Sequence, residues 1–130
     1  MKPLIECVPN FSEGRDPEVI RQITDAITSV PEVKLLNVDP GKATNRTVVT
    51  FVGEPQFVIE AAYRAIEKAG QLIDMRHHSG EHPRMGATDV CPLIPIANIS
   101  MEETVQYAHQ LAQRVGESLN LPVYLYEAAQ

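Results

Sequence analysis

The chain has 130 residues, of which 11 are Lys or Arg and 17 are Asp or Glu, so its net charge at pH 7 is −6 with histidine neutral. This negative charge argues against a nucleic-acid partner, because backbone phosphates require a surplus of Lys and Arg. Its length and 44% hydrophobic content predict one globular domain over residues 1–130. The sequence has no apolar run of membrane-spanning length and no signal-peptide core in MKPLIECVPN, so we expect a cytoplasmic protein without a membrane partner.

The N-terminal part of the chain predicts a strand followed by a helix. Residues 4–8 form a short β-type run that ends at Pro9. Asp16 can accept a hydrogen bond from a free backbone amide, and Pro17 suits the first helical position. Apolar residues then recur at helical spacing as far as Val30, which predicts the first helix.

The middle of the chain predicts a β-hairpin and a second helix. Residues 33–39 and 46–52 are typical of strands, and the turn cluster PGKATN separates them. Pro55 opens a helix with a regular apolar stripe. Gly70 can cap this helix, or the helix can extend to Ile73.

The C-terminal part predicts an irregular strand and a third helix. Residues 90–96 are apolar but contain Pro92 and Pro95, which restricts them to an edge or irregular strand. Ser100 and Glu103 have the spacing of a capping box, which marks the start of a helix.

With a last short strand at 122–126, the predicted order is β-α-β-β-α-β followed by α-β. The first six elements match a ferredoxin-like α/β sandwich, so the predicted fold class is α+β, with a mostly antiparallel sheet and helices on one face. In this topology the segments 8–15, 39–46 and 74–89 lie at the same end of the sheet. The most polar stretches of the chain are therefore expected to converge.

Three of the four histidines lie between positions 77 and 82, inside a segment (DMRHHSGEHPRMGATD) without helical or strand period. Long unpatterned segments in compact domains are usually functional or disordered. His82 stands next to Glu81 and close to Arg84, and an imidazole that titrates near pH ~6.5 suits a general base. The alternative is a solvated polar loop.

A metal site is a second alternative for this segment. His78 and His82 are four residues apart, which would place two ligands on one face of a helix. However, Gly80 lies between them and Pro83 follows, and both disfavour a helix interior. We therefore predict no metal, and a non-helical metal site stays open.

The predicted hairpin and the first polar segment supply further candidates. Arg46 can bind a carboxylate through its planar guanidinium group, or it can pair with Asp39 in a structural role. Asn10 belongs to the polar segment after the first strand, where the residues alone favour a turn and a helix cap. The two cysteines, Cys7 and Cys91, each lie in an apolar run, and we expect buried, reduced thiols.

Three stretches, ECVPNFSEGRD, TNRTVVTFVG and GEHPRMGATDVCPLIPI, resemble the formiminotransferase family, specifically its N-terminal subdomain. The third stretch is long and unusual, and the likeness runs over essentially the whole chain, closing at LPVYLYE. Members of the family move a formimino group from formiminoglutamate to tetrahydrofolate in histidine breakdown. The resemblance implies a transferase with tetrahydrofolate as co-substrate.

The resemblance also implies a role for one histidine. The catalytic histidine of the family lies in the GEHPR motif, which places it at His82 in this sequence, with the expected role of general base. The remaining candidates come from the predicted convergence of polar segments. Arg46 and Arg84 are candidates for the carboxylates of folate or formiminoglutamate, Asp39 for orienting the imidazole, and Asn10 for substrate binding.

The family fold contains two similar ferredoxin-like subdomains with folate in the cleft between them, and the second subdomain is absent from this sequence. We therefore expect a C-terminal formiminotransferase subdomain as a partner and weak substrate binding by this chain alone. Apolar surface left uncovered would allow a homodimer. The alternative to an enzyme is a non-catalytic binding or assembly module with the same fold.

Overall fold

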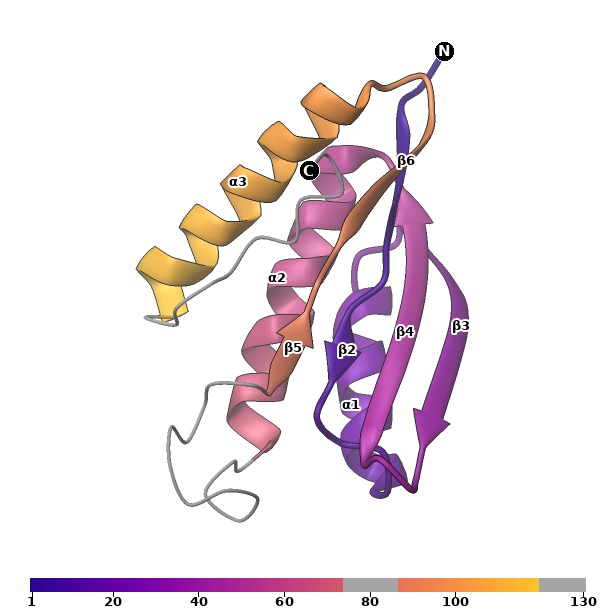
Figure 1. The fold of residues 1–130 in the computed structure, drawn as a ribbon, viewed down its shortest axis with the longest axis vertical. Coiled ribbons are helices and arrows are strands. Elements are labelled where there is room, and N and C mark those ends of the chain that lie inside the picture. Colours follow the sequence, from indigo (N-terminus) through magenta and orange to yellow (C-terminus); the bar gives the residue numbers. More distant parts are fainter. Residues whose placement is uncertain (74–86, 120–130) are drawn as a thin grey trace.

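The computed structural model describes residues 1–73 and 87–119 of the chain. Over these residues the elements follow in the order β1 (Leu4–Cys7), β2 (Asn10–Phe11), α1 (Pro17–Thr28), β3 (Lys34–Gly41), β4 (Arg46–Gly53), α2 (Pro55–Leu72), β5 (Thr88–Val90), β6 (Leu93–Ala97) and α3 (Met101–Leu119). Figure 1 shows their arrangement.

The described strands form one antiparallel sheet. β1 and β2 lie end to end along one side of β4, and β3 pairs with the other side of β4. β6 and β5 lie end to end in the same way, pairing with β1 and β2 respectively. The order across the sheet is therefore β3, β4, β1 with β2, and β6 with β5.

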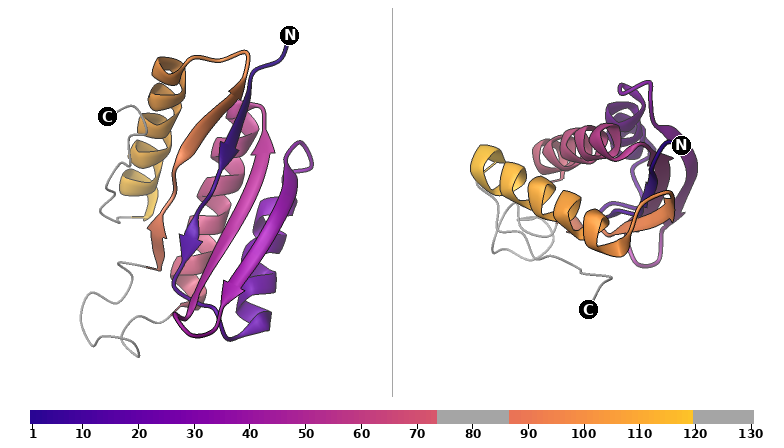
Figure 2. Two further views of the ribbon diagram at one scale, coloured as in Figure 1. Left: turned by 45° about the vertical axis from the view of Figure 1, so that its right-hand side comes forward. Right: turned by 90° about the horizontal axis from the view of Figure 1, so that it is seen from above.

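When each end-to-end pair counts as one strand, the chain has the βαββαβ order of a ferredoxin-like sandwich, with its first strand inside the sheet and its second at an edge. The predicted α+β fold class is confirmed. α1 and α2 pack side by side on one face of the sheet, and α3 packs against α2 and β6 (Figure 2). The predicted position of the helices on one face is confirmed as well.

The core lies between this face and the helices. Side chains alternate along β4, so that every second residue, from Thr47 to Gly53, is buried toward the helices. From β1, Ile5 and Cys7 point to the same side and are fully buried. The part of α2 that faces the sheet consists largely of fully buried alanines, which let the helix lie close to the strands: Ala61, Ala62, Ala65 and Ala69.

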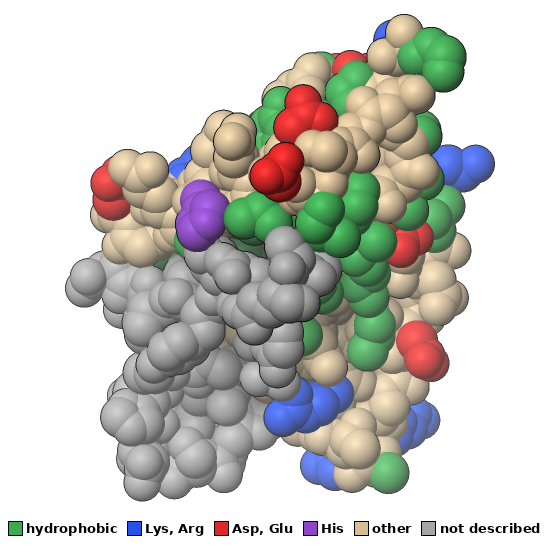
Figure 3. Space-filling model, turned by 45° about the horizontal axis from the view of Figure 1, so that its top comes forward, with side chains coloured by type: hydrophobic (Ala, Val, Ile, Leu, Met, Phe, Trp, Pro, Cys, Tyr) green, Lys and Arg blue, Asp and Glu red, His purple; other side chains and the backbone are tan. Residues whose placement is uncertain are grey.

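We call the opposite face of the sheet the open face, because no described helix packs on it. It carries the alternate strand residues, namely Glu6, Asn10, Lys34, Asn37, Asp39, Arg46, Val48, Thr50, Val52 and Ile94. Its apolar members are half-buried rather than buried. In Figure 3, hydrophobic side chains gather on this side of the molecule, above Lys and Arg side chains nearer its lower end.

The predicted helix starts of α1 and α3 are confirmed. Asp16 Oδ1 accepts a hydrogen bond from the backbone N–H of Glu18 at 3.0 Å, and Pro17 opens α1. At α3, the Ser100 N–H donates to Glu103 Oε1 at 2.9 Å, and the Glu103 N–H donates to Ser100 Oγ at 3.0 Å. Among the described residues, no helix combines the length and the apolar character that crossing a bilayer requires.

α2 extends to Leu72, so extension past Gly70 is the correct one of the two predicted helix ends. The structure corrects two other details of the prediction. The strand predicted at 90–96 is divided into β5 and β6, and β5 begins at Thr88, inside the predicted loop. The division falls at Pro92, which has no N–H to donate. β2 was not predicted, because Pro9 was interpreted as the end of the sheet, and the strand predicted at 122–126 lies outside the described residues.

A charged network joins the three described helices on their outer side. The carboxylate of Glu60 in α2 accepts a hydrogen bond from Arg64 Nε at 2.7 Å and another from Arg114 Nη1 of α3 at 2.6 Å. The Arg114 guanidinium also lies 3.8 Å from the ring centroid of Tyr63. Arg64 Nη1 donates to Ser29 Oγ after the end of α1 at 2.9 Å. The hydrogen bond from Arg114, helped by Arg64, lowers the pKa of Glu60 although partial burial opposes it.

Replacing Glu60 with Gln should lower the free energy of unfolding at pH 7 by about 1 kcal/mol, because it removes the charge on which both guanidinium groups converge. Folding lowers the pKa of Glu60 below its ordinary value of 4.5. The stabilisation is therefore complete above pH 4.5 and is lost as the pH falls through the lower folded-state pKa. Urea unfolding of both proteins from pH 7 down to about pH 2 measures this difference.

The control is Glu67→Gln, two turns along the same helix and outside this network, which should change stability little at any pH. An equal loss in both variants, or a loss from Glu60→Gln that persists unchanged in acid, would contradict the assigned role of the network.

Candidate functional site

The polar segments that the sequence predicts to converge meet at one end of the sheet, which we call the rim. It comprises residues 12–16 between β2 and α1, residues 42–45 of the β3–β4 hairpin, and Ala87 before β5. The rim is the lower end of the molecule in Figure 1. For these segments the predicted convergence is confirmed. His82 and Arg84 lie in 74–86, outside the described residues.

Gly14 brings the first loop of the rim into direct contact with the hairpin. Its backbone N–H donates to Asn45 Oδ1 at 2.9 Å. Asn45 has a φ of 55°, in the left-handed region that Asn adopts more readily than most residues. A Cβ atom at Gly14 would stand 2.5 Å from the carbonyl oxygens of both Gly41 and Arg46. Glycine is therefore required for the loop to lie against the hairpin.

Further hydrogen bonds close this loop on the hairpin and on itself. Arg15 Nε donates to the carbonyl oxygen of Lys42 at 2.8 Å, and the buried Thr47 hydroxyl donates to the carbonyl oxygen of Glu13. Glu13 Oε2 accepts from the backbone N–H groups of Arg15 and Asp16 at 3.1 and 3.0 Å. Because the amides of Gly14, Arg15 and Asp16 already have hydrogen-bond acceptors, the loop does not present them as an anion-binding nest.

The third segment joins the rim through the backbone. The Ser12 N–H donates to the carbonyl oxygen of Ala87 at 2.9 Å. Ala87 itself is buried, and β5 follows it directly and pairs with β2. In the sequence, Ala87 lies five positions after His82. This hydrogen bond thus joins the first loop of the rim to the residue that precedes β5.

Strand pairing places two of the predicted site residues in one row across the open face. Asp39 of β3 and Asn10 of β2 are both register partners of Val48 in β4. Directly paired residues project to the same face, and with one strand between them their Cα atoms are about 10 Å apart. Arg46 lies two residues from Val48 on the same strand, so it belongs to the same face. The sheet therefore brings Asn10, Asp39 and Arg46 together.

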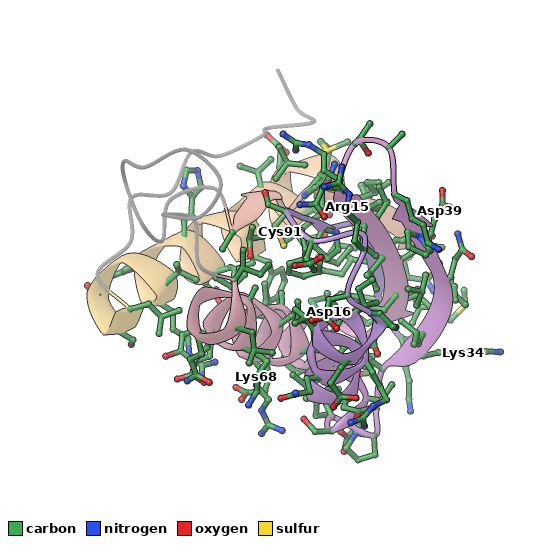
Figure 4. All side chains as sticks on the ribbon, turned by 90° about the horizontal axis from the view of Figure 1, so that it is seen from below. Arg15, Asp16, Lys34, Asp39, Lys68 and Cys91 are labelled. Atoms are coloured by element: carbon green, nitrogen blue, oxygen red, sulfur yellow. The ribbon has the colours of Figure 1, made fainter. Side chains whose placement is uncertain are left out.

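The rim contains two positive charges, Arg15 and Lys42, and two negative charges, Glu13 and Asp16. Arg15 and Lys42 are exposed, as is Arg46 at the start of β4, next to the hairpin. Seen from this end of the molecule, Arg15 lies between Cys91 on one side and Asp39 on the other (Figure 4). Each of these three cationic side chains is of a type that can pair with a carboxylate.

Among the described residues, two buried polar atoms at the rim end of the sheet lack a hydrogen-bond partner, Asn10 Oδ1 and Thr88 Oγ1. They belong to the paired strands β2 and β5. A buried acceptor without a partner is costly, and native proteins rarely leave one unsatisfied. At this end of the sheet, the hydrogen-bonding capacity of these two side chains is therefore unused among the described residues.

Analysis of the residues alone missed three contributors to this arrangement. Gly14 and Arg15 were assigned to a turn and a helix cap, and Thr88 was assigned to a loop. A glycine between polar residues indicates a tight turn or a close backbone contact. Only the folded structure shows that backbone atoms of the hairpin occupy the space that a Cβ atom at Gly14 would need. Among the described residues, no group of three or more His, Cys, Asp or Glu side chains is arranged to hold a metal ion. His78 and His82, on which the metal alternative depends, lie outside those residues.

Comparison with known families matches residues 4–130 to the formiminotransferase domain, N-terminal subdomain. The chain belongs to this family. The resemblance of the three sequence stretches is thereby confirmed.

Among curated relatives, formimidoyltransferase-cyclodeaminase of Rattus norvegicus is 60% identical over 131 residues, which cover 100% of this chain and 24% of the relative. Glutamate formimidoyltransferase of Thermoplasma acidophilum is 52% identical over 128 residues, covering 98% of the chain and 42% of the relative. The enzyme of the same name from Streptococcus pyogenes is 45% identical over 127 residues, with the same coverage of 98% and 42%. The chain thus spans less than half the length of these relatives.

Replacing Gly14 with Ala should destabilise the subdomain by about 2–3 kcal/mol, because the added methyl group collides with backbone atoms that cannot move independently. The loss is measured by urea unfolding. The control is Gly70→Ala in α2, where an added Cβ meets nothing within 4 Å, and this variant should be neutral or up to about 1 kcal/mol more stable. Equal stabilities of the two variants would show that the close contact at Gly14 is unimportant.

Proposed function

We propose that this chain is the N-terminal subdomain of a folate-dependent transferase that moves a formimino group from formiminoglutamate to tetrahydrofolate in histidine degradation. Family membership and relatives named glutamate formimidoyltransferase support this class of reaction. The structural observation that carries the proposal is the row containing Asn10 and Asp39 on the open face, near Ala87, which lies five positions after His82 in the sequence. Tetrahydrofolate acts as co-substrate.

In the proposed reaction His82 is the general base. Its imidazole removes the proton from the folate ring nitrogen while that nitrogen attacks the amidine carbon of formiminoglutamate. A tetrahedral intermediate forms, and the bond from this carbon to the glutamate nitrogen then breaks. The same imidazole returns the proton to the departing nitrogen, so that glutamate leaves as a neutral amine.

The remaining candidates bind and orient. Asp39 is proposed to accept a hydrogen bond from the imidazole, which would fix its orientation and stabilise its protonated form. Arg46 and Arg84 are proposed to bind carboxylates of formiminoglutamate or folate. The exposed Arg15 and Lys42 at the rim are further cations that a carboxylate could contact. Asn10 is proposed to bind substrate through its side-chain amide, and its buried Oδ1 without a partner supports this role.

A C-terminal formiminotransferase subdomain is the proposed partner. The open face carries half-buried apolar side chains, and Leu36 and Ile96 at the sides of the sheet are 48% and 51% exposed. Apolar surface of this kind commonly marks an interaction site. We propose that the remaining part of the protein covers this face and encloses the substrates, and that the isolated chain can use the same face to form a homodimer.

The 130-residue chain alone should show little or no transferase turnover and weak binding of tetrahydrofolate, because a cleft with one wall encloses too little of a small molecule. Calorimetry with and without the C-terminal part of a longer relative, such as the Thermoplasma acidophilum enzyme, measures binding. Robust turnover by the purified chain without a partner would contradict the need for a second subdomain. Turnover that stays absent after the partner is supplied would favour a non-catalytic module.

In the complete protein, His82→Asn should lower kcat by about 10²–10⁴-fold, the usual contribution of general acid–base catalysis. KM for formiminoglutamate should change much less. The wild-type kcat/KM should fall below pH ~6.5 as the imidazole becomes protonated, and the variant should lose this acid limb.

The control is His109→Asn, since His109 is an exposed residue of α3 and is not among the proposed site residues. This variant should retain both activity and pH profile. Survival of wild-type activity in His82→Asn would remove the proposed base, whereas equal losses in both histidine variants would indicate a general structural effect.

A further inference from the structure

The two cysteines of the chain meet in the folded protein although they lie 84 positions apart. Cys7 of β1 is fully buried among core residues on the helix-facing side of the sheet. Cys91 is half-buried and lies between β5 and β6, outside both strands. Both are free thiols, and their Sγ atoms are 3.3 Å apart. The proposed transferase reaction uses neither of them.

We propose that Cys7 and Cys91 are a modification site at which a two-electron thiol oxidant, a hydroperoxide or a small disulfide, forms a reversible intramolecular disulfide. A disulfide requires an S–S distance of about 2.05 Å, so two side chains share an approach of about 1.2 Å. The chain can accommodate this approach because the strand is interrupted at Pro92, beside Cys91, where the regular ladder of β5 and β6 is broken. Cys7 supplies a fixed partner from the centre of the sheet.

The two thiols have different parts in this reaction. Burial, reinforced by the neighbouring Cys91 sulfur, raises the pKa of Cys7 well above its ordinary value, so Cys7 stays protonated and shielded from solvent. Cys91 is partly accessible to solvent. Cys91 therefore meets the oxidant first, and Cys7 resolves the product.

With a hydroperoxide, the Cys91 thiolate attacks one oxygen, an S–O bond forms and the O–O bond breaks. The leaving oxygen takes a proton and departs as water or an alcohol, and Cys91 becomes a sulfenic acid. The Cys7 sulfur then attacks the Cys91 sulfur, an S–S bond forms and the S–O bond breaks. The departing hydroxide takes the Cys7 proton and leaves as water. The two thiols are oxidised and the peroxide is reduced, with one reducing equivalent from each cysteine.

The bond would connect the central strand to the segment that leads from β5 into β6. Asn10 lies three residues after Cys7, and its register partner Val90 directly precedes Cys91. Oxidation would therefore tie β5 to the centre of the sheet directly beside the row on the open face. Because the bond closes a loop of most of the chain, it should restrict the unfolded state and stabilise the fold.

To test this proposal, the folded chain is treated with increasing concentrations of hydrogen peroxide, and the remaining free thiols are then blocked with an alkylating reagent. Intact-mass analysis should show the loss of two hydrogen atoms and no alkylation, and peptide mapping should find Cys7 joined to Cys91. Dithiothreitol should restore both thiols. The oxidised protein should melt about 5–15 °C higher than the reduced protein. Oxidised glutathione as a second oxidant should give the same product.

Two single variants provide the controls. Cys7→Ala should stop at a Cys91 sulfenic acid that dimedone traps, and Cys91→Ala should leave Cys7 reacting about tenfold more slowly than the wild-type pair.

Two free thiols after peroxide treatment, a disulfide between separate chains, or oxidation of Cys7 at the wild-type rate without Cys91 would each overturn the proposal. If Cys7→Ala fails to fold, the wild-type mapping and Cys91→Ala still decide the question. No readout requires formimino transfer, so failure here leaves the proposed function unaffected.

Discussion

The contact between Gly14 and the β3–β4 hairpin is the constraint on which the rim depends. A hydrogen bond to Asn45 Oδ1 and the lack of space for any side chain fix the first loop against the hairpin. The backbone hydrogen bond from Ser12 to Ala87 then joins this loop to the residue that precedes β5. Segments separated by tens of residues in sequence thereby become one rigid edge. Rigid placement of this kind is what a site for two substrates requires.

The division of the sheet into two different faces links the fold to the proposed function. The helix-facing side is a closed core with small alanines from α2, whereas the open face combines half-buried apolar residues with Asn10, Asp39 and Arg46. A polar row beside uncovered apolar surface is consistent with a chain that spans less than half the length of the relatives compared. Cys7 lies three residues before Asn10, and Cys91 directly follows Val90, the register partner of Asn10. The proposed disulfide would therefore form close to this row.

Much of the fold was predictable from the sequence, because its signals involve residues that are close along the chain. Asp16 caps α1, and Ser100 with Glu103 caps α3, through hydrogen bonds that span two or three residues. The alternation in β4 and the helical period in α2 are equally local. The order of these helices and strands allows few sheet topologies, and the ferredoxin-like topology is one of them. That topology in turn predicts that the polar loops converge at one end of the sheet. The family resemblance added the candidate role of His82, which the described residues do not include.

Features that depend on contacts between distant residues were decided by the tertiary structure alone. β2 and β5 are too short to be recognised and exist because they pair with each other and, in the case of β2, with β4. The need for glycine at position 14 arises from backbone atoms of another strand. Asn10 and Asp39 share a row only because both pair with the same residue of β4, and the two sulfurs meet across 84 positions. The sequence by itself thus determined the elements and their order, whereas the register of the strands decided which side chains became neighbours. The physical reason is that strand register is set by packing and pairing across the whole sheet, and no short stretch of sequence contains that information.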